Sequence, residues 1–350
     1  MRWIYLILLL ILSIKDSYTA ILSNIRLPVD TNGNEIVTGE ASVLKRDSLY
    51  YFYFNDWGDC PGIDCCNSTE GCASCCFNEN PIKNCSNPYL NDHVVRAYAT
   101  DFVRWIDLGI VLSLENRLPG IEFRPCVVYN ALTDTYVMWY EDRAPGEIGY
   151  AVATSKDPAG PFQTIRTNVT MPGDGKIGDF NIFVDDDGCA YHVRTGFDLV
   201  LLDENYTGPE RWIASFDPPK RSEGPTMFKR SGVYYITAGT DCCACLGGSS
   251  IYIYRSDALE GPWDFRGDVG SNPTPFDPHS PANYVTKAQG SAIFHTSDSV
   301  VWLGNQWNSG LSQSPPGPRN HDLLYWAPFS FNSEGDIDQL SYHEHVIISP

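Results

Sequence analysis

The feature that most constrains the fold is a pattern that recurs five times along the 350-residue chain. Each copy joins a short apolar strand to an aromatic-rich strand through a turn rich in Asp, Gly, Ser or Asn, which is the pattern of a β-hairpin. The copies span residues 41–55, 124–142, 179–196, 223–239 and 290–307. A third strand follows each hairpin, and a short excursion with a further strand follows in residues 94–109, 148–165 and 251–267.

Five such four-stranded units in succession predict an all-β fold, a five-bladed β-propeller. A decorated β-sandwich would also supply many short strands and is the alternative. No helix-length amphipathic run interrupts the series, which disfavours α/β folds. We therefore expect residues 21–350 to form a single propeller domain, with a Cys-rich insertion at 58–92 between the second and third strands of the first blade.

The first twenty residues, MRWIYLILLLILSIKDSYTA, resemble a secretory signal peptide. One Arg precedes an apolar run, and small or polar residues follow it up to a possible cleavage point at Ala20. A retained anchor is the alternative, but the run from Trp3 to Ile14 is short for a bilayer. We expect a secreted protein without stable membrane association.

The chain has twelve cysteines, and seven of them lie between Cys60 and Cys85. In a secreted protein such a cluster indicates disulfide bonds, whose pairing cannot be deduced from the sequence. Zinc is the alternative because Cys72 and Cys75 have CxxC spacing, but no second well-spaced pair follows them. N-glycosylation motifs at Asn67, Asn84, Asn168 and Asn205 are consistent with a glycosylated exterior.

Charge and composition restrict the partners. The formal net charge is −19, and the first twenty residues contribute +1 of it through Arg2, Lys15 and Asp16. Nucleic acid is therefore an unsuitable partner, because phosphate binding needs a basic face. Aromatic residues make up 13% of the chain, which suits both a core of many strands and a surface on which sugar rings stack. We expect a monomer that binds an oligosaccharide or polysaccharide.

Polar side chains recur at the start of the first strand of each unit. In a propeller these inner strands run along the central axis in the same sense, so their starts gather at one mouth. The residues there are Glu40, Glu122 with Arg124, Asp179, Glu223 and Gln289. Each alone is also typical of a turn-capping residue. By contrast, residues 185–187 form an opposite hairpin tip, which we interpret as a solvated turn and not as a metal site.

Carboxylates that converge in an aromatic, water-filled mouth fit glycoside hydrolysis, which needs a carboxylic acid to protonate the leaving oxygen and a second group to manage water. Glu223 is the candidate acid, since compact Gly224 and Pro225 follow it and a nearby carboxylate would favour its protonated form. Asp179 is the candidate for that neighbouring carboxylate.

Five segments resemble successive blade starts of glycoside hydrolase family 43, especially the subfamily 24 group that contains exo-β-1,3-galactanases. They are FRPCVVYN, GDFNIFVDDDG, SEGPTMFKRSGVYY, AQGSA and GNQW, within a resemblance that covers residues 28–340. The resemblance implies a five-bladed propeller and an inverting, exo-acting enzyme that releases galactose from β-1,3-galactan. It implies that Glu223 is the general acid, that Asp179 tunes its pKa and orients it, and that Gln289 holds the attacking water.

Two departures from the family pattern bear on mechanism. The first blade starts with TGEASVL, which has neither the usual basic Asp nor the galactanase-like His-Gly-Gly-Gly, so either Glu40 substitutes or a conventional base is absent. On the second blade, one residue separates Glu122 from Arg124 where the galactanase pattern reads Glu-Arg-Pro. Glu40, Glu122 and Arg124 are candidate substrate contacts, but Glu122 would contact substrate only if a bulge restores its direction, because a one-residue shift turns a strand side chain over.

Trp139, Tyr140 and Trp307 are candidate sugar platforms, and core packing is the alternative for each. Propellers of this family can hold calcium near the axis, but no residue string resembles a calcium loop. We therefore assign no metal ligand and expect no required cofactor. Two other functions stay open: an arabinofuranosidase or xylosidase of the same fold, and a non-catalytic carbohydrate-binding propeller.

Overall fold

The computed structural model describes most of the chain outside the Cys-rich segment. The described residues are 18–56, 94–117, 121–144, 147–173, 177–216, 222–240, 249–271, 285–307, 309 and 321–350, with the backbone alone at 121, 122, 143, 144, 147, 148 and 240. Its only helical element in these ranges is a short 3-10 turn at Leu114–Asn116. The protein is all-β, as its sequence predicts.

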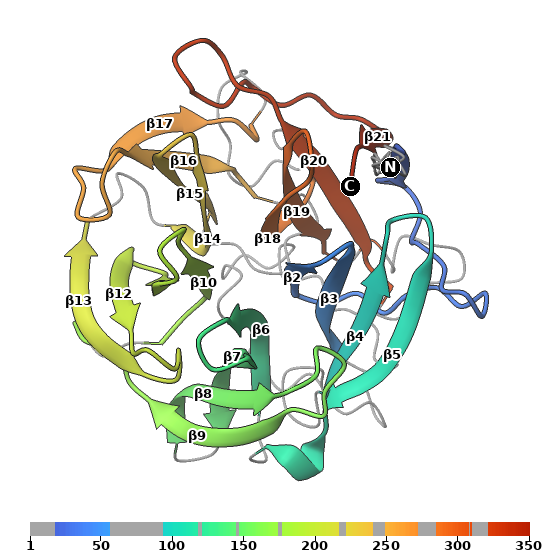
Figure 1. The fold of residues 1–350 in the computed structure, drawn as a ribbon. Helices are drawn as coiled ribbons and strands as arrows, with labels where there is room; N and C mark the ends of the chain where they lie inside the picture. The colour runs from blue at the N-terminus through green and yellow to red at the C-terminus, as the bar shows by residue number, and fades with distance from the viewer. Residues whose placement is uncertain are drawn as a thin grey trace, which may run out of the picture.

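Five antiparallel sheets surround one axis and form a five-bladed β-propeller (Figure 1). The first blade contains β2 (Ala41–Arg46), β3 (Leu49–Asp56), β4 (Val94–Thr100) and β5 (Trp105–Leu112). The second contains β6 (Ile121–Asn130), β7 (Thr135–Ala144), β8 (Glu147–Ser155) and β9 (Gln163–Val169). The third contains β10 (Phe180–Val184), β11 (Ala190–Arg194), β12 (Asp198–Leu202) and β13 (Pro209–Ser215). The fourth contains β14 (Ser222–Arg230), β15 (Val233–Thr240), β16 (Tyr252–Ser256) and β17 (Asp264–Asp268).

The fifth blade differs from the predicted four-stranded unit. In the described part of the chain it has three strands, β18 (Gln289–His295), β19 (Val300–Gln306) and β20 (Leu323–Phe329). Beside it, β1 (Ala20–Ser23) pairs with β21 (His345–Ile348) in a two-stranded sheet. Asn24, which follows β1, is buried and exchanges hydrogen bonds with the backbone of Trp326 in β20, so the two ends of the described chain are fastened to the fifth blade.

Apolar side chains fill the space between each pair of neighbouring blades. One cluster lies between blades five and one, and four others lie between the successive blades around the ring. Their largest members are aromatic, as β-branched and aromatic strands with buried faces predict. The high aromatic content of the chain is therefore explained largely by these five interfaces.

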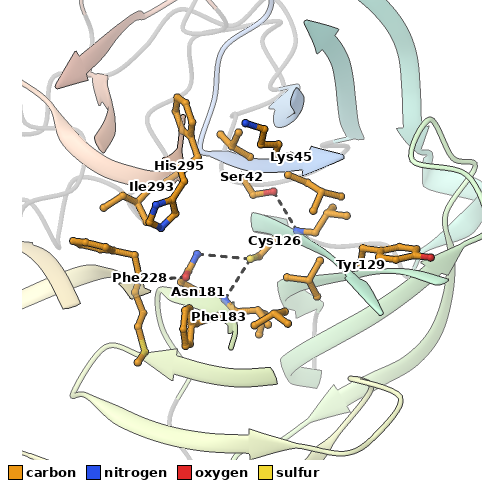
Figure 2. Close-up of a pocket in the computed structure, with 18 of the residues that line it drawn as sticks. Ser42, Lys45, Cys126, Tyr129, Asn181, Phe183, Phe228, Ile293 and His295 are labelled. Carbon is orange, nitrogen blue, oxygen red and sulfur yellow. Dashed lines mark hydrogen bonds between the residues drawn. The ribbon is translucent and has the colours of Figure 1, made fainter. Parts of the chain in front are cut away.

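The inner strands β2, β6, β10, β14 and β18 all start at the same end of the axis and line a cavity toward its other end (Figures 1 and 2). Three of them begin with a β-bulge, where the strand pairing shifts between Phe123 and Cys126, between Glu223 and Thr226, and between Gly290 and Ala292. A bulge adds one residue to one strand and re-aims the side chains beside it. The bulge that the second-blade prediction required is present.

The interpretation of residues 185–187 as a solvated turn is wrong for Asp185. Its side chain is largely buried and accepts hydrogen bonds from Lys229 Nζ and Tyr234 Oη, each at 2.7 Å. These contacts connect the third blade to the fourth. Asp186 and Asp187 are exposed, as predicted.

Several sequence predictions concern residues outside the described ranges. They are the signal peptide up to residue 17, the cysteines from Cys60 to Cys85, and the sequons at Asn67 and Asn84. Cys126 and Cys189 carry free thiols, and Asn168 and Asn205 are exposed. Within the described ranges, no helix is both long and apolar enough to cross a membrane.

Candidate active site

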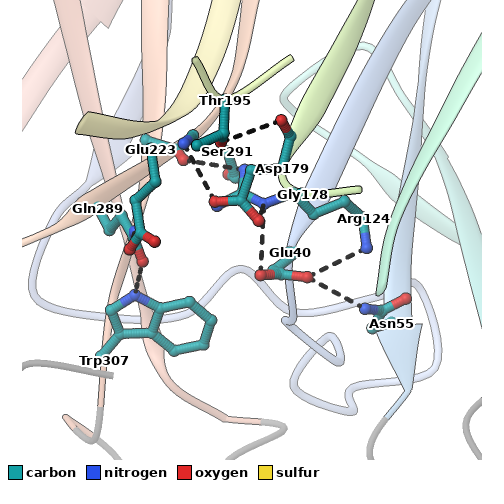
Figure 3. A network of polar contacts seen from close by, with 12 residues as sticks. Glu40, Asn55, Arg124, Gly178, Asp179, Thr195, Glu223, Gln289, Ser291 and Trp307 are labelled. Carbon is teal, nitrogen blue, oxygen red and sulfur yellow. Dashed lines mark hydrogen bonds and ion pairs between the residues drawn. The ribbon is translucent and has the colours of Figure 1, made fainter. Parts of the chain in front are cut away.

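Glu223, Gln289 and Trp307 form a hydrogen-bonded chain at the mouth where the inner strands start (Figure 3). Gln289 Nε2 donates to Glu223 Oε1 at 2.6 Å, and Trp307 Nε1 donates to Gln289 Oε1 at 2.6 Å. Because an indole N–H can only donate, it determines which end of the amide is the oxygen. The NH₂ group of Gln289 is therefore directed at Glu223, which is half-buried, whereas Gln289 is 2% exposed.

Asp179 connects three blades at this mouth. Its Oδ2 accepts a hydrogen bond from the backbone N–H of Gly224 at 3.0 Å, and its Oδ1 forms an ion pair with Arg124 Nε at 2.7 Å. Since Gly224 directly follows Glu223, this carboxylate holds the backbone that carries Glu223. The structure thus brings Asp179, Glu223 and Gln289 to one place, from three different blades (Figure 3).

Arg124 is the cation at the centre of the cluster and is 5% exposed. Besides Asp179, it pairs with Glu40 Oε1 at 3.5 Å, and its Nη1 donates to the carbonyl oxygen of Gly290 at 3.4 Å. Burial disfavours the charged guanidinium, but the carboxylates of Asp179, Glu40 and Glu223 outweigh burial and raise the pKa of Arg124 above its ordinary value. Arg124 therefore stays charged and compensates the surrounding carboxylates.

Glu40 lies under this cluster and is buried. Its Oε2 accepts hydrogen bonds from the backbone N–H of Arg124 at 3.1 Å and from Asn55 Nδ2 at 3.4 Å. With the ion pair to Arg124, both carboxylate oxygens are engaged. A carboxylate held this way is a counter-ion for a buried cation.

The backbone conformation at residue 224 explains why the acid at residue 223 is followed by a glycine. Its φ is +63°, in the left-handed region that favours glycine. A Cβ at this position would lie 3.1 Å from the carbonyl oxygen of Gly290 and 3.3 Å from Arg124 Nη2. The bulge and the close approach therefore both need Gly224, and together they aim Glu223 into the mouth.

The other predicted contacts have different environments. The backbone of Glu122 pairs with Asp142, but its side chain is outside the described part of the structure. Trp139 is 0% exposed, packs between the second and third blades and donates its indole N–H to the Tyr206 carbonyl oxygen, so it is a core residue and offers no face to a sugar. Tyr140 is likewise fully buried. Trp307 contacts the cluster through its N–H, and its ring is largely buried beside Phe123.

Tyr150 and Thr195 are site neighbours that sequence reasoning missed. Tyr150 Oη donates to the carbonyl oxygen of Gly178 at 2.7 Å and accepts from its N–H at 3.1 Å. Burial raises the pKa of Tyr150 well above its usual range, so the phenol keeps its proton. On the other side, the N–H of Thr195 donates to the Asp179 carbonyl oxygen at 2.7 Å. Both residues hold the backbone of the Gly178–Asp179 segment, and neither belongs to a recognisable motif.

The cluster can therefore supply two half-buried carboxyl groups, Asp179 and Glu223, with an amide beside Glu223 and a buried cation beneath them. Such a set can donate a proton and orient a small polar molecule. Among the residues the structure describes, no group of three or more His, Cys, Asp or Glu side chains is arranged to hold a metal ion.

Several solved structures share the fold. A family 43 β-1,3-galactosidase bound to galactodeoxynojirimycin superimposes with a TM-score of 0.71 at 20% identity, over 92% of this chain and 99% of that protein. An exo-β-1,3-galactanase from Clostridium thermocellum gives 0.69 at 22% identity, over 94% of this chain and 68% of that protein. An exo-β-1,3-galactanase from Phanerochaete chrysosporium, bound to galactose, gives 0.69 at 20% identity, over 91% of this chain and 66% of that protein. At these identities the similarity establishes the fold.

No curated protein matches the chain in sequence. The family model of glycosyl hydrolases family 43, however, matches residues 91–320. That range contains Arg124, Asp179, Glu223 and Gln289, and Glu40 precedes it. Because the match spans well over half of the chain, this glycosidase belongs to glycosyl hydrolases family 43.

Proposed function

We propose that the chain is a secreted, exo-acting enzyme that releases galactose from β-1,3-galactan, such as the backbone of type II arabinogalactan, with inversion of configuration. The observation that carries the proposal is the 2.6 Å contact between Gln289 and Glu223, at a mouth where Asp179 holds the adjacent backbone. The three structures compared above, each described as a β-1,3-galactosidase or exo-β-1,3-galactanase, support the choice of sugar and linkage.

In this proposal Glu223 is the general acid. It is half-buried at the mouth, and it can give its proton to the glycosidic oxygen as the bond to the leaving group breaks. Asp179 acts through the backbone of Gly224, which it fixes at 3.0 Å, and through Arg124. Its negative charge near Glu223 would favour the protonated acid.

Gln289 is the group that we propose to hold and orient the attacking water. Its oxygen accepts one hydrogen bond from Trp307 and has a second lone pair that can accept one from water. An amide orients water but is too weakly basic to hold the proton at neutral pH. The engagement of Glu40 by Arg124 and Asn55 argues against Glu40 as the base.

The test uses β-1,3-galactotriose with the wild-type chain and with Glu223→Gln. We expect galactose from the wild type and a fall in kcat of about a thousandfold in the variant, with sugar binding retained. Glu210→Gln, at an exposed position on β13, is the matched control and should keep full activity. A Glu223→Gln enzyme that retains its turnover would refute the assignment of the acid.

Matched arabinofuranosides and xylosides separate this proposal from its alternatives. Arabinose or xylose as the released sugar would identify the same fold and mechanism with a different specificity. Binding of galactotriose without hydrolysis of any of the three substrates would indicate a carbohydrate-binding propeller. On a longer galactan, early products of mixed length would contradict exo action.

A further inference from the structure

The central channel contains a cavity of about 490 Å³ (Figure 2). It lies toward the ends of the inner strands, whereas the candidate active site lies at their starts. This volume is in the range of about 300–1,000 Å³ that is typical of small-molecule pockets. Its lining comes from all five inner strands, at residues 42–46, 126–129, 181–184, 227–229 and 292–295, and from Asp186. Lys45 lies near the end of the first inner strand, β2, and Glu40 directly precedes the start of that strand.

Polar side chains at the inner end of the cavity already have partners. Three backbone N–H groups each bond to a side chain of the preceding blade: Val127 to Ser42 Oγ at 3.2 Å, Ile182 to Cys126 Sγ at 3.4 Å and Met227 to Asn181 Oδ1 at 3.4 Å. Burial raises the pKa of the Cys126 thiol to about 12, so the thiol is neutral. The inner end thus presents an uncharged surface with little spare hydrogen-bonding capacity.

The cavity opens to solvent at the far opening of the channel, opposite the active-site mouth. The walls between the inner end and this far opening are apolar. They are formed by Val43, Val127, Phe183, Phe228 and Ile293. A ligand that enters from the far opening would therefore place its apolar part inward, where burial of apolar surface is favourable. Any charge that it carries would stay at the far opening.

The far opening carries two groups that can donate to an anion, Lys45 and His295 (Figure 2). Lys229 is paired with Asp185 and Asp186, and the guanidinium of Arg46 stacks on the Tyr129 ring at 3.9 Å. No carboxylate of the described residues pairs with Lys45, whose Nζ lies 4.8 Å from the Tyr50 ring centroid. Burial and the charge of Lys45 lower the pKa of His295, so its neutral imidazole offers one N–H donor.

We infer that this cavity binds a small organic carboxylate with an apolar body, held at Lys45 and His295 with its body against Phe228 and Ile293. The negative charge of the protein does not prevent this: Asp186 in the lining is paired with Lys229 at 3.0 Å, and charges more than about 8 Å away are largely screened at physiological salt. A planar aromatic acid and a sugar acid share the required chemistry, a carboxylate attached to a body with an apolar face. This inference is independent of the galactanase proposal.

Isothermal titration calorimetry with the full chain tests the inference. The probes are benzoate and D-glucuronate, each compared with its uncharged counterpart, benzyl alcohol or D-glucose. We expect at least one acid to bind about tenfold more tightly than its counterpart, since charge-assisted hydrogen bonds are about twice as strong as neutral ones. The acid that binds identifies which of the two bodies the walls accept.

Two substitutions locate the binding. Lys45→Met keeps the length of the side chain but removes its charge. It should weaken the affinity for the acid about tenfold without changing the affinity for the uncharged counterpart. The control is Lys287→Met, which removes another exposed lysine near a tyrosine ring, with Nζ 6.0 Å from the Tyr342 centroid. Ile293→Trp should reduce binding of both members of the pair by filling the cavity.

Three results would overturn the inference: neither acid binds, an acid and its uncharged counterpart bind equally, or Lys45→Met binds the acid as tightly as the wild type. Thermal unfolding of each variant shows whether it is folded. Lys45 is exposed, so its substitution should leave the unfolding temperature close to that of the wild type.

Discussion

Gln289 donates a hydrogen bond of 2.6 Å to Glu223 across the boundary between the fifth and fourth blades. These residues are 66 positions apart in the chain and meet because both lie at the start of an inner strand. The amide is oriented by Trp307, so the direction of this hydrogen bond is determined by a third residue.

Gln289→Glu would place a second carboxyl group at hydrogen-bonding distance from Glu223. Like charges disfavour ionisation, so the protonated acid should persist to higher pH. Activity that needs this acid falls as pH rises through its titration, and we therefore expect the alkaline limb of the kcat/KM profile to move up by about one pH unit. Gln339→Glu, at an exposed amide that donates to the backbone of Val269 and Ser271, should leave the profile unchanged.

Trp307→Phe removes the N–H that orients the Gln289 amide. We expect kcat to fall about tenfold with KM nearly constant, because the amide orientation affects the transition state more than substrate binding. A rise in KM with unchanged kcat would instead indicate a sugar platform. The control is Trp326→Phe, a core position whose indole N–H has no hydrogen-bond partner, where only stability should fall.

Tyr150→Phe removes the phenol that bonds both backbone groups of Gly178, next to Asp179. We expect a fall in kcat of about tenfold and a shifted pH profile, because Asp179 would lose its fixed position against Gly224 and Arg124. Tyr53→Phe is the matched control, since Tyr53 is also fully buried and donates to the Pro158 carbonyl oxygen at 2.9 Å. If both variants lose the same stability and neither changes the pH profile, Tyr150 has a structural role only.

His192 predicts how stability depends on pH. It is 0% exposed, stacks on Phe180 with ring centroids 4.8 Å apart, and neither ring nitrogen has a hydrogen-bond partner. Burial and then the charge of Arg194 lower its pKa from 6.5 to about 3. Protonation of His192 is therefore less favourable in the folded state than in the unfolded state. The free energy of unfolding is fully retained above pH 6.5 and falls by about 1.4 kcal/mol per pH unit as the pH drops from 6.5 toward 3.

His192→Phe should make the free energy of unfolding depend less on pH in this range. Between pH 6.5 and 4.5 we expect the variant to lose about 2.5 kcal/mol less unfolding free energy than the wild type. Urea unfolding at several pH values measures the difference, and His345→Gln, at an exposed strand position, is the control. Parallel curves for the wild type and His192→Phe would show that His192 is not the source of acid sensitivity.

The sequence predicts the blades well because each hairpin depends on local signals. All five predicted hairpins occur, and the convergence of Asp179, Glu223 and Gln289 follows from the common direction of the inner strands. The fifth blade deviates because the last described strand, β21, pairs with β1 in a separate sheet and not with β20. A pairing between strands so far apart in the chain is not reported by any local pattern.

The finer details of the site depend on contacts between blades. The bulge after Phe123 turns Arg124 into the cluster, and an alternating pattern cannot reveal one inserted residue. Asp185 looks like an exposed turn residue because its partner Lys229 lies 44 positions further on. Trp139 resembles a sugar platform in sequence, but its position facing the third blade puts both of its faces in the core.

The pairing of β1 with β21 has a consequence for protein engineering. Ala20 lies opposite Ile348, about one strand spacing of 5 Å away, so a short linker could join these positions and new termini could be opened at an exposed hairpin tip elsewhere. A ring of similar blades has no intrinsic first member, and such a circular permutant should fold to the same architecture as long as the β1–β21 pair is kept intact.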